Sequence, residues 1–341
     1  MNKKNISIKE IAKLSGVSVA TVSRVINNNG RFSEETRKKI LKIIEENNYS
    51  TNVIAKSLRM KKSNTIGIMV PDISNFFFSS IVQEIERIMF EQGYSTIICN
   101  TARNIDKETA YLRMLESKMI DGLIVISGLR EFGIENMSKQ IPLVCIDRKP
   151  KDTDNTAFIE SDHLEGAKLA TTELINAGAT KIIIMMHALT SSSQEARLNG
   201  FVSVFKQRRI PISDNNIVKI PKMNKEEEVI YIRNFLQNNC VLSKSINGIF
   251  AINDSIGITI LKEAKTLGIN VPLDLKVIGF DNIPEASIIT PGLSTIKQDY
   301  KQIAKKACET LINSIKSPDT ITPVRQEIPV TLIKRGSTTG I

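Results

Sequence analysis

The sequence predicts an all-α helix-turn-helix head joined to an α/β core of two doubly wound parallel-sheet lobes. The formal net charge is +10, and residues 1–62 hold 14 basic and 5 acidic residues, so nearly all of the excess lies there. Short, capped helical stretches fill that same segment. From residue 64 onward, apolar runs alternate with helical stretches, as is typical of α/β domains. A basic segment attached to a nearly neutral core indicates a module that binds a polyanion.

The head is expected to span residues 1–49 as three short helices. A serine stands where it can cap the start of each helix, and Glu10 has the spacing of a capping box with the first of these serines. A Ser15-Gly16-Val17 turn separates the first two helices. Three short helices around one small core follow the helix-turn-helix plan. The capping residues are Ser7, Ser18 and Ser33.

The core is expected to span residues 64–341, with buried strands marked by short apolar runs. The strands are expected at 66–70, 96–99, 123–126, 143–146, 181–186, 248–252, 276–279 and 330–333. The helices are expected at about 80–91, 106–118, 164–177, 194–207, 226–237, 255–267 and 299–315. The predicted division gives lobe 1 about 64–161 and 295–326, and lobe 2 about 162–294 and 327–341.

The composition argues against several functional classes. The four cysteines form no CxxC pair and no GxGxxG motif occurs, so neither a metal nor any other cofactor is expected. The serines at 191–193 lack a GxSxG setting and a histidine partner, so an enzyme is not expected. The chain start lacks an apolar leader, and no apolar run approaches the ~18 residues of a membrane span. We therefore expect a cytoplasmic protein that does not contact a membrane.

The second helix of the head carries the side chains of a DNA recognition helix. Arg24 can bond guanine O6 and N7 together, and Val19 or Ala20 can pack against a thymine methyl group. The next helical turn places Arg24 beside Ala20. The alternative is that the apolar positions are ordinary core residues, which we accept for Val22. Hydroxyl groups that can contact phosphates are supplied by Ser18, Thr21 and Ser23.

Residues 7–27, SIKEIAKLSGVSVATVSRVIN, resemble the head of the LacI/GalR family of transcriptional regulators almost position by position. SEETRKKI at 33–40 resembles the third helix of that head, and the likeness continues through DGLI at 121–124, RLNGF at 197–201 and IGFDN at 278–282. The resemblance implies a sequence-specific DNA-binding regulator, usually a repressor. A small-molecule effector, such as a sugar or sugar derivative, would set its affinity for a near-palindromic operator.

Residues 50–63 resemble the hinge helix and linker of the family. Thr51 stands where the family usually has proline, and Lys56 stands where arginine is common. By resemblance, Leu58 from each subunit would wedge into the central minor-groove step and kink the DNA. The alternative is a solvated linker. The expected DNA contacts are Ser7, Ser18, Val19, Ala20, Thr21, Ser23, Arg24, Asn27, Ser33, Tyr49, Asn52, Ala55, Lys56 and Leu58.

The family core resembles periplasmic sugar-binding proteins, which implies an effector held between the two lobes. Arg197 matches the family's effector-clamping arginine, and Asp281 matches a common hydroxyl acceptor. Phe77 and Phe78 are expected in the loop after the first strand, where an aromatic face could stack on a sugar or base. The alternatives are a turn at Asp281 and core packing for the phenylalanines. The expected effector contacts are Phe77, Phe78, Asp147, Arg148, Asp162, Ser193, Arg197, Asn253 and Asp281.

A near-palindromic operator implies a homodimer, because operator symmetry mirrors protein symmetry. The helices around 81–89 and 255–267 are the expected interface elements. Three other interpretations remain. The first is a regulator governed by a partner protein, as in the carbon-control members of the family. The second is a solute-binding protein for transport, against which the basic head argues. The third and weakest is an α/β sugar-modifying enzyme.

Overall fold

The computed structural model divides the chain into two compact units, Met1–Ser63 and Asn64–Ile341. Among the described residues, no helix combines the length and apolar character needed to cross a membrane. Four of the expected hinge contacts, namely Asn52, Ala55, Lys56 and Leu58, lie outside the described residues. The structure describes residues 6–47, 49, 62–128, 132, 141–153, 156–188, 191–317 and 325–339.

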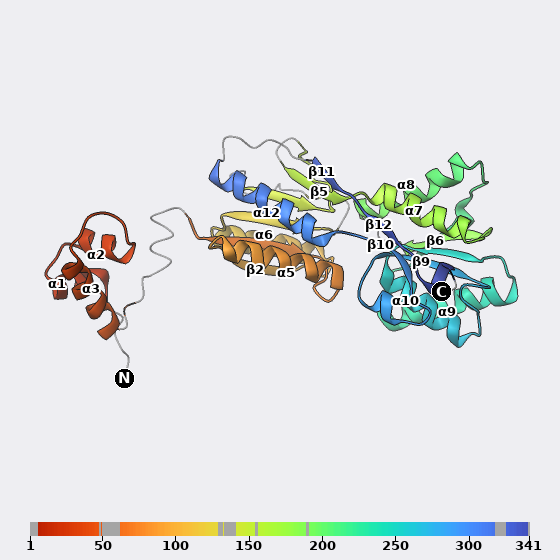
Figure 1. Cartoon of the computed structure of the whole chain (residues 1–341), viewed down its shortest axis with the longest axis horizontal. Coiled ribbons are helices and arrows are strands. Elements are labelled where there is room, and N and C mark those ends of the chain that lie inside the picture. Colours follow the sequence, from red (N-terminus) through yellow and green to blue (C-terminus); the bar gives the residue numbers. More distant parts are fainter. Residues whose placement is uncertain are drawn as a thin grey trace. The chain divides into compact units, whose positions relative to one another are not determined.

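The head is a bundle of three helices (Figure 1), namely α1 Ile8–Ser15, α2 Val19–Ile26 and α3 Glu34–Glu46. The serine before each helix accepts a hydrogen bond from a first-turn amide, so all three expected caps are present. Gly16 ends α1 with φ 70°, a left-handed conformation that glycine adopts without strain. The centre of the small core is formed by Ile11, Val22, Val25 and Ile40.

Lobe 1 is a six-stranded parallel sheet in the order β11-β5-β4-β3-β1-β2. Ile124 and Val125, neighbours in β3, belong to different apolar clusters, so each sheet face has its own core. Helices α5 (Phe76–Glu91) and α12 (Tyr300–Lys316) cover one face, and α6 (Ile105–Ser117) covers the other. The strands are β1 Thr65–Val70, β2 Ser95–Asn100, β3 Gly122–Ile126, β4 Leu143–Ile146, β5 Ala157–Ser161 and β11 Arg325–Ile328.

Lobe 2 has a second six-stranded sheet in the order β12-β10-β9-β8-β6-β7, with β12 antiparallel to β10. Its strands are β6 Ile182–His187, β7 Ile217–Ile220, β8 Gly248–Ala251, β9 Lys276–Asp281, β10 Ser294–Lys297 and β12 Thr331–Ile333. Its longer helices are α7 His163–Asn176, α8 Ser192–Gln207, α9 Lys225–Leu236 and α10 Asp254–Thr266. Figure 1 shows the two lobes as separate bodies of the core, which agrees with the expected fold class.

Three chain crossovers join the lobes, at residue 162, at 298–299 and at 329–330. Strand β10 therefore belongs to lobe 2, and β11 belongs to lobe 1. The boundaries expected at 294/295 and 326/327 fall inside these two strands, and the structure places them later, at the crossovers. Both strands are four residues long and polar, so the sequence showed no apolar run by which to locate them.

The phenylalanines expected in a loop lie instead in the first turn of α5. The reason is local, because Asn75 Oδ1 accepts hydrogen bonds from the amides of Phe77 and Phe78 at 3.0 and 3.3 Å and so caps the helix start. Both rings are buried, so they are part of the core as well as close to the strand ends.

Candidate functional site

A small cavity of about 40 Å³ lies between the lobes of the core. Its lining side chains follow β1, β2, β3 and β4 in lobe 1, and follow β6 and β8 or end β9 in lobe 2. Ligands of open α/β sheets bind at these carboxyl ends of strands. The lining residues are Asn75, Phe77, Phe78, Arg103, Ser127, Asp147, Ser191, Ser193, Gln194, Arg197, Asn253 and Asp281.

Most of the expected effector contacts meet in this one cavity. Seven of the nine line it, namely Phe77, Phe78, Asp147, Ser193, Arg197, Asn253 and Asp281. The other two do not. Arg148 turns away from the cavity to a buried ion pair with Glu108, and its guanidinium lies 4.7 Å from the ring centroid of Phe132. Asp162 caps α7, where it accepts a hydrogen bond from the Glu165 amide at 2.9 Å.

Five lining residues were not expected from the sequence. The rule that ligands lie at strand ends could have found Ser127, which directly follows β3, and Arg103, which lies shortly after β2. It gives no direction for the side chains, and the sequence offers no other signal for the rest. The five are Asn75, Arg103, Ser127, Ser191 and Gln194.

Arg197, on the lobe 2 wall of the cavity, contacts an aromatic ring, a carboxylate and a backbone carbonyl. Its guanidinium carbon lies 3.6 Å above the ring centroid of Phe280, a cation–π contact. Its Nη2 lies 3.5 Å from Asp281 Oδ1, and its Nη1 donates to the Ile252 carbonyl at 2.5 Å. Burial lowers the pKa of Arg197, and the carboxylates of Asp281 and Asp147 oppose that shift. The planar fork is therefore fixed in orientation before any ligand arrives.

The two cavity carboxyl groups have opposite pKa shifts. Burial raises the pKa of Asp281 to about 6, although Arg197 and the Gln298 amide, 2.7 Å away, pull it down. Burial also acts to raise the pKa of Asp147, but His163, the Ser161 amide and Arg197 outweigh it and the net shift is downward. Asp147 is therefore the more fully ionised of the two carboxyl groups near neutral pH.

Charged side chains on the cavity wall balance in number. Two are cations, Arg103 and Arg197, and two are carboxylates, Asp147 and Asp281. Arg103 is exposed, and the carboxylate of Asp72 favours its charged form. Because guanidinium groups stay protonated in proteins, the wall as a whole carries almost no net charge near neutral pH. Such a wall suits a neutral ligand that both donates and accepts hydrogen bonds.

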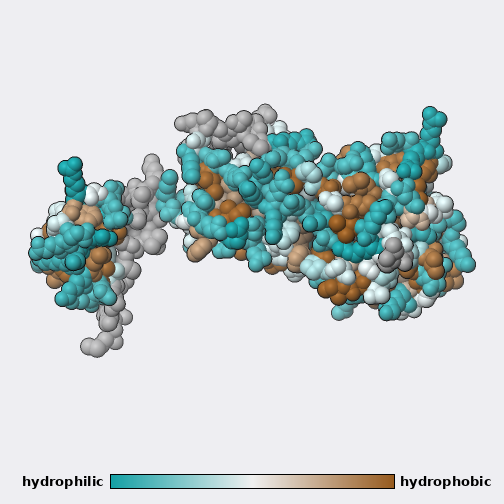
Figure 2. Space-filling model, in the orientation of Figure 1, coloured by the Kyte–Doolittle hydropathy of each residue, from teal (hydrophilic) through white to brown (hydrophobic). Residues whose placement is uncertain are grey.

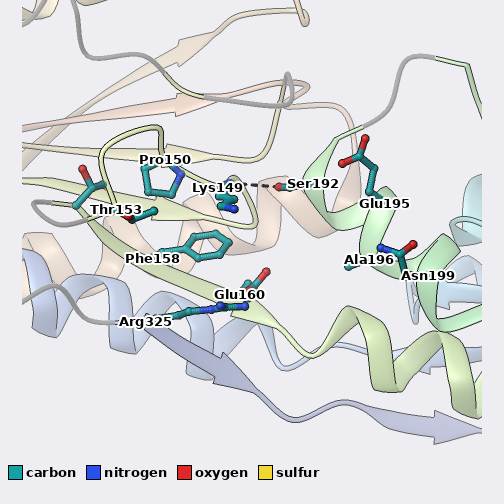
Figure 3. A pocket seen from close by; sticks show the side chains of 11 residues that line it. Lys149, Pro150, Thr153, Phe158, Glu160, Ser192, Glu195, Ala196, Asn199 and Arg325 are labelled. Carbon is teal, nitrogen blue, oxygen red and sulfur yellow. Dashed lines mark hydrogen bonds and ion pairs between the residues drawn. The ribbon is translucent and has the colours of Figure 1, made fainter. Parts of the chain in front are cut away.

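A larger cavity of about 410 Å³ opens at the lobe seam beside β5 (Figure 3). In Figure 3, Glu195 and Asn199 of α8 lie on one side and Lys149 lies on the other, with the Lys149 amide 3.2 Å from Ser192 Oγ. None of the expected effector contacts lines it. Its long charged side chains are partly or fully exposed, whereas the inner cavity is lined by the buried residues Asp147, Gln194 and Arg197, with Arg103 exposed. The inner cavity is therefore the better ligand site.

The exposed face of α2 carries the side chains expected to read DNA. Val19, Ala20 and Arg24 are exposed, whereas Val22 and Val25 are buried in the head core. The surface of the head that faces the viewer in Figure 2 is mostly hydrophilic. The exposed side of α2 is therefore free to enter a DNA groove, while its buried side packs in the core of the head.

Several of the other expected DNA contacts have structural partners within the head. Ser18 and Ser33 accept hydrogen bonds from the amides of Thr21 and Thr36, each at 3.1 Å, and Ser7 forms the capping box. Asn27 Nδ2 donates to the Ser23 carbonyl at 2.7 Å. The capping serines also mark helix N-termini, where backbone amides favour a phosphate.

Comparison with known proteins shows which protein family this chain resembles. Residues 7–52 match bacterial regulatory proteins of the lacI family, and residues 171–338 match a periplasmic binding protein-like domain. The chain is 33% identical over 334 residues to the ribose operon repressor of Halalkalibacterium halodurans, which covers 98% of this chain and 97% of that repressor. The chain belongs to the LacI family. It is also 32% identical over 316 residues to the repressor PurR of Vibrio atlanticus, covering 92% and 93% of the two chains.

Solved structures of LacI-family proteins share the fold. The Lac repressor dimer bound to operator and the anti-inducer ONPF matches with a TM-score of 0.84 and 23% identity over 98% of this chain and 99% of that one. A LacI-family regulator from Enterococcus faecium with bound ribose matches with a TM-score of 0.70 and 27% identity, over 81% and 99%. The expected family, fold class and DNA-binding regulator are confirmed, and the relatives are repressors rather than enzymes. The alternatives of a transport protein and of a regulator governed by a partner protein are not favoured.

Proposed function

We propose that this LacI-family regulator represses transcription and that a neutral monosaccharide in the cavity between the lobes sets its operator affinity. The observation that carries the proposal is the charge balance of the cavity wall, on which Arg197 and Asp147 are buried and Arg103 is exposed. A phosphate group would bring a charge of about −1.5 to −2 to a wall whose two guanidinium groups already face two carboxylates. Sugar hydroxyls can instead donate to the carboxylates and accept from the arginine forks.

Two further features of the wall suit a sugar. Phe77 and Phe78, with ring centroids 5.7 Å apart, supply an apolar surface beside the polar groups. Gln194 Oε1 is buried and has no hydrogen-bond partner among the described residues. A buried acceptor without a partner costs free energy, and a hydroxyl group would supply the missing donor. This arrangement favours a ligand with apolar C–H faces and several hydroxyls.

The relatives suggest which sugar to test first. One relative is named a ribose operon repressor, and the Enterococcus regulator contains ribose. A LacI-type protein of Alkaliphilus metalliredigens, 28% identical with a TM-score of 0.70 over 81% of this chain and 99% of that one, is complexed with D-xylulofuranose. We therefore take D-ribose as the primary probe and D-xylulose as the second.

The cavity between the lobes is too small to admit a sugar unless the lobes move. Ligand pockets are typically ~300 Å³ or more, whereas this cavity measures about 40 Å³. A sugar therefore requires the lobes to part, and the crossovers at 162, 298–299 and 329–330 are where the backbone can bend. We propose that this movement changes operator affinity through the segment at 50–63, most of which lies outside the described residues.

We further propose that the regulator acts as a homodimer in the cytoplasm, where operator DNA is found. A near-palindromic operator requires two heads related by a two-fold axis. The expected interface helices correspond to α5 and α10, and Phe90 near the end of α5 is 73% exposed. Light scattering of the full chain should give a dimer, and a stable monomer or tetramer at micromolar concentration would contradict this.

The deciding experiment measures sugar binding and operator binding with the full chain. Titration calorimetry should show binding of D-ribose, much weaker binding of ribose 5-phosphate, and loss of binding in Arg197→Ala. Anisotropy with an operator selected from random duplexes should respond to D-ribose in the parent and not in Arg197→Ala, whose sugar-free affinity should stay unchanged. The control is Arg208→Ala, an exposed arginine just after α8. Preference for the phosphate, or an unaltered response of Arg197→Ala, contradicts the proposed site.

A further inference from the structure

His163 lies behind the cavity and contacts one lining side chain from each lobe. It is the first residue of α7, directly after the crossover at Asp162, and its side chain is 1% exposed. Its Nε2 lies 2.9 Å from Asp147 Oδ1, in lobe 1. Its Nδ1 lies 3.4 Å from Arg197 Nε, in lobe 2. The imidazole itself does not line the cavity, but both of its partners do.

The partners of His163 fix its protonation state and tautomer. Arg197 Nε carries a hydrogen at all accessible pH values, so Nδ1 must accept that hydrogen bond. The imidazole proton then lies on Nε2, which donates to the Asp147 carboxylate. Burial lowers the pKa of His163, and Arg197 lowers it further, while Asp147 opposes both. Only the neutral Nε2–H tautomer satisfies both contacts.

Asp147 is tied to both sides of the same crossover. Its Oδ1 accepts from the Ser161 amide at 3.0 Å as well as from His163 Nε2. Ser161 ends β5 of lobe 1, and His163 begins α7 of lobe 2. Rotation of the lobes about Asp162 therefore moves the two donors of Asp147 relative to one another, and moves Arg197 with α8.

We propose that His163 is a positioning residue that joins lobe closure to assembly of the sugar site, and that its protonation uncouples the two. This inference rests on the proposed function and deepens it. In the closed core, one neutral imidazole holds the lobe 1 carboxylate and the lobe 2 arginine in the same arrangement. A protonated imidazole places an N–H group and a positive charge against Arg197 Nε–H, which removes one hydrogen bond and adds like-charge repulsion.

The pH dependence has other contributors that a test must separate. Asp147, Arg197 and Asp162 are the charged groups that act on His163, and the ring of Phe280 lies 5.8 Å away. Asp281 faces Arg197 from β9. Burial and the charge of Asp147 raise the pKa of Glu160 to about 7. His187 is the other histidine of the chain.

The test is calorimetric titration of D-ribose into the full chain between about pH 5 and about pH 8, the range in which histidine titrates. The parent should lose affinity toward the acid end. His163→Phe should bind about 10- to 100-fold more weakly even at the alkaline end, because two charged groups lose a partner. His163→Gln can accept from Arg197 and donate to Asp147, so it should regain most of the affinity and keep only the acid loss that Asp281, with its pKa of about 6, contributes. Glu160→Gln and His187→Gln should keep the acid loss.

Two results overturn the inference: His163→Phe binding as tightly as the parent, or His163→Gln keeping the parent's pH profile. If the parent binds none of the neutral sugars, the proposed function fails and the inference is decided by ¹⁵N spectra of His187→Gln, which leaves His163 as the one histidine. An Nε2–H tautomer of His163 with a pKa below the usual ~6.5 supports the proposed positioning role of His163. An Nδ1–H tautomer or an ordinary pKa rejects it.

Discussion

Arg148 donates through Nη1 and Nη2 to the two carboxylate oxygens of Glu108, at 2.9 and 3.0 Å, in an ion pair buried within lobe 1. The pair joins α6 to the loop after β4, directly beside Asp147 of the cavity. A Cβ on Gly128 would lie 3.2 Å from Arg148 Nη1, so the glycine leaves room for the guanidinium. Arg148 thus supports the cavity wall from behind instead of touching a ligand.

Glu108→Gln should destabilise the core strongly, because it removes the carboxylate that pairs with the buried Arg148 guanidinium. The expected loss in free energy of unfolding is about 3–5 kcal/mol, measured by urea denaturation. Glu91→Gln is the matched control, since it removes an exposed partner of Arg87 and should cost less than about 1 kcal/mol. Equal effects of the two substitutions would mean that the buried pair contributes no more than the exposed one.

Arg24→Ala should relax base preference at one position in each operator half-site. The expected cost is about 1–3 kcal/mol toward the preferred base and little toward the other bases, because Arg24 is exposed on the free face of α2. Selection of binding sites from random duplexes, followed by anisotropy, measures both. Lys206→Ala in the core serves as a control for charge. An unchanged preferred sequence would show that another element reads the bases.

Leu58→Ala should weaken specific operator binding while D-ribose binding stays as in the parent. The resemblance to the family predicts that the leucine inserts between base pairs, and an alanine would be too short to unstack them. Leu58 lies outside the described residues, so this prediction rests on the sequence. Anisotropy with specific and random duplexes, together with calorimetry for the sugar, separates the two activities. Full operator affinity in Leu58→Ala would reject the wedge.

Glu160→Gln should change how stability depends on pH. The pKa of Glu160 rises from 4.5 to about 7 on folding, because burial outweighs the contact with Arg325. The folded state therefore holds this proton more tightly, and the contribution is fully present below pH 4.5 and lost as pH rises to about 7. Thermal unfolding of the parent should show this loss, and Glu160→Gln should show a smaller one, because Asp281, with its pKa raised to about 6, still contributes. Glu327→Gln, which removes another partner of Arg325, should retain it.

The sequence predicted those parts of the fold that are determined locally. Capping residues and apolar spacing located the three head helices, and strands such as β3, all of whose residues are buried, were visible as apolar runs. Strand β11, with the sequence RQEI, forms a sheet edge, so its pairing with β5 depends on partners more than 160 residues away. The rule for strand ends led to Asp147 but also to Arg148. Neighbouring side chains point in different directions there, and the sequence gives no rotamers.

The three crossovers have a consequence for how the protein is made. Each lobe is assembled from separate stretches of chain, and lobe 1 lacks α12 and β11 until every long helix of lobe 2 has been synthesised. The head, in contrast, is a single continuous stretch at the start, and N-terminal units fold first during translation. Synthesis of the head is therefore complete, and its helices can form, before either lobe of the sensor has all of its strands.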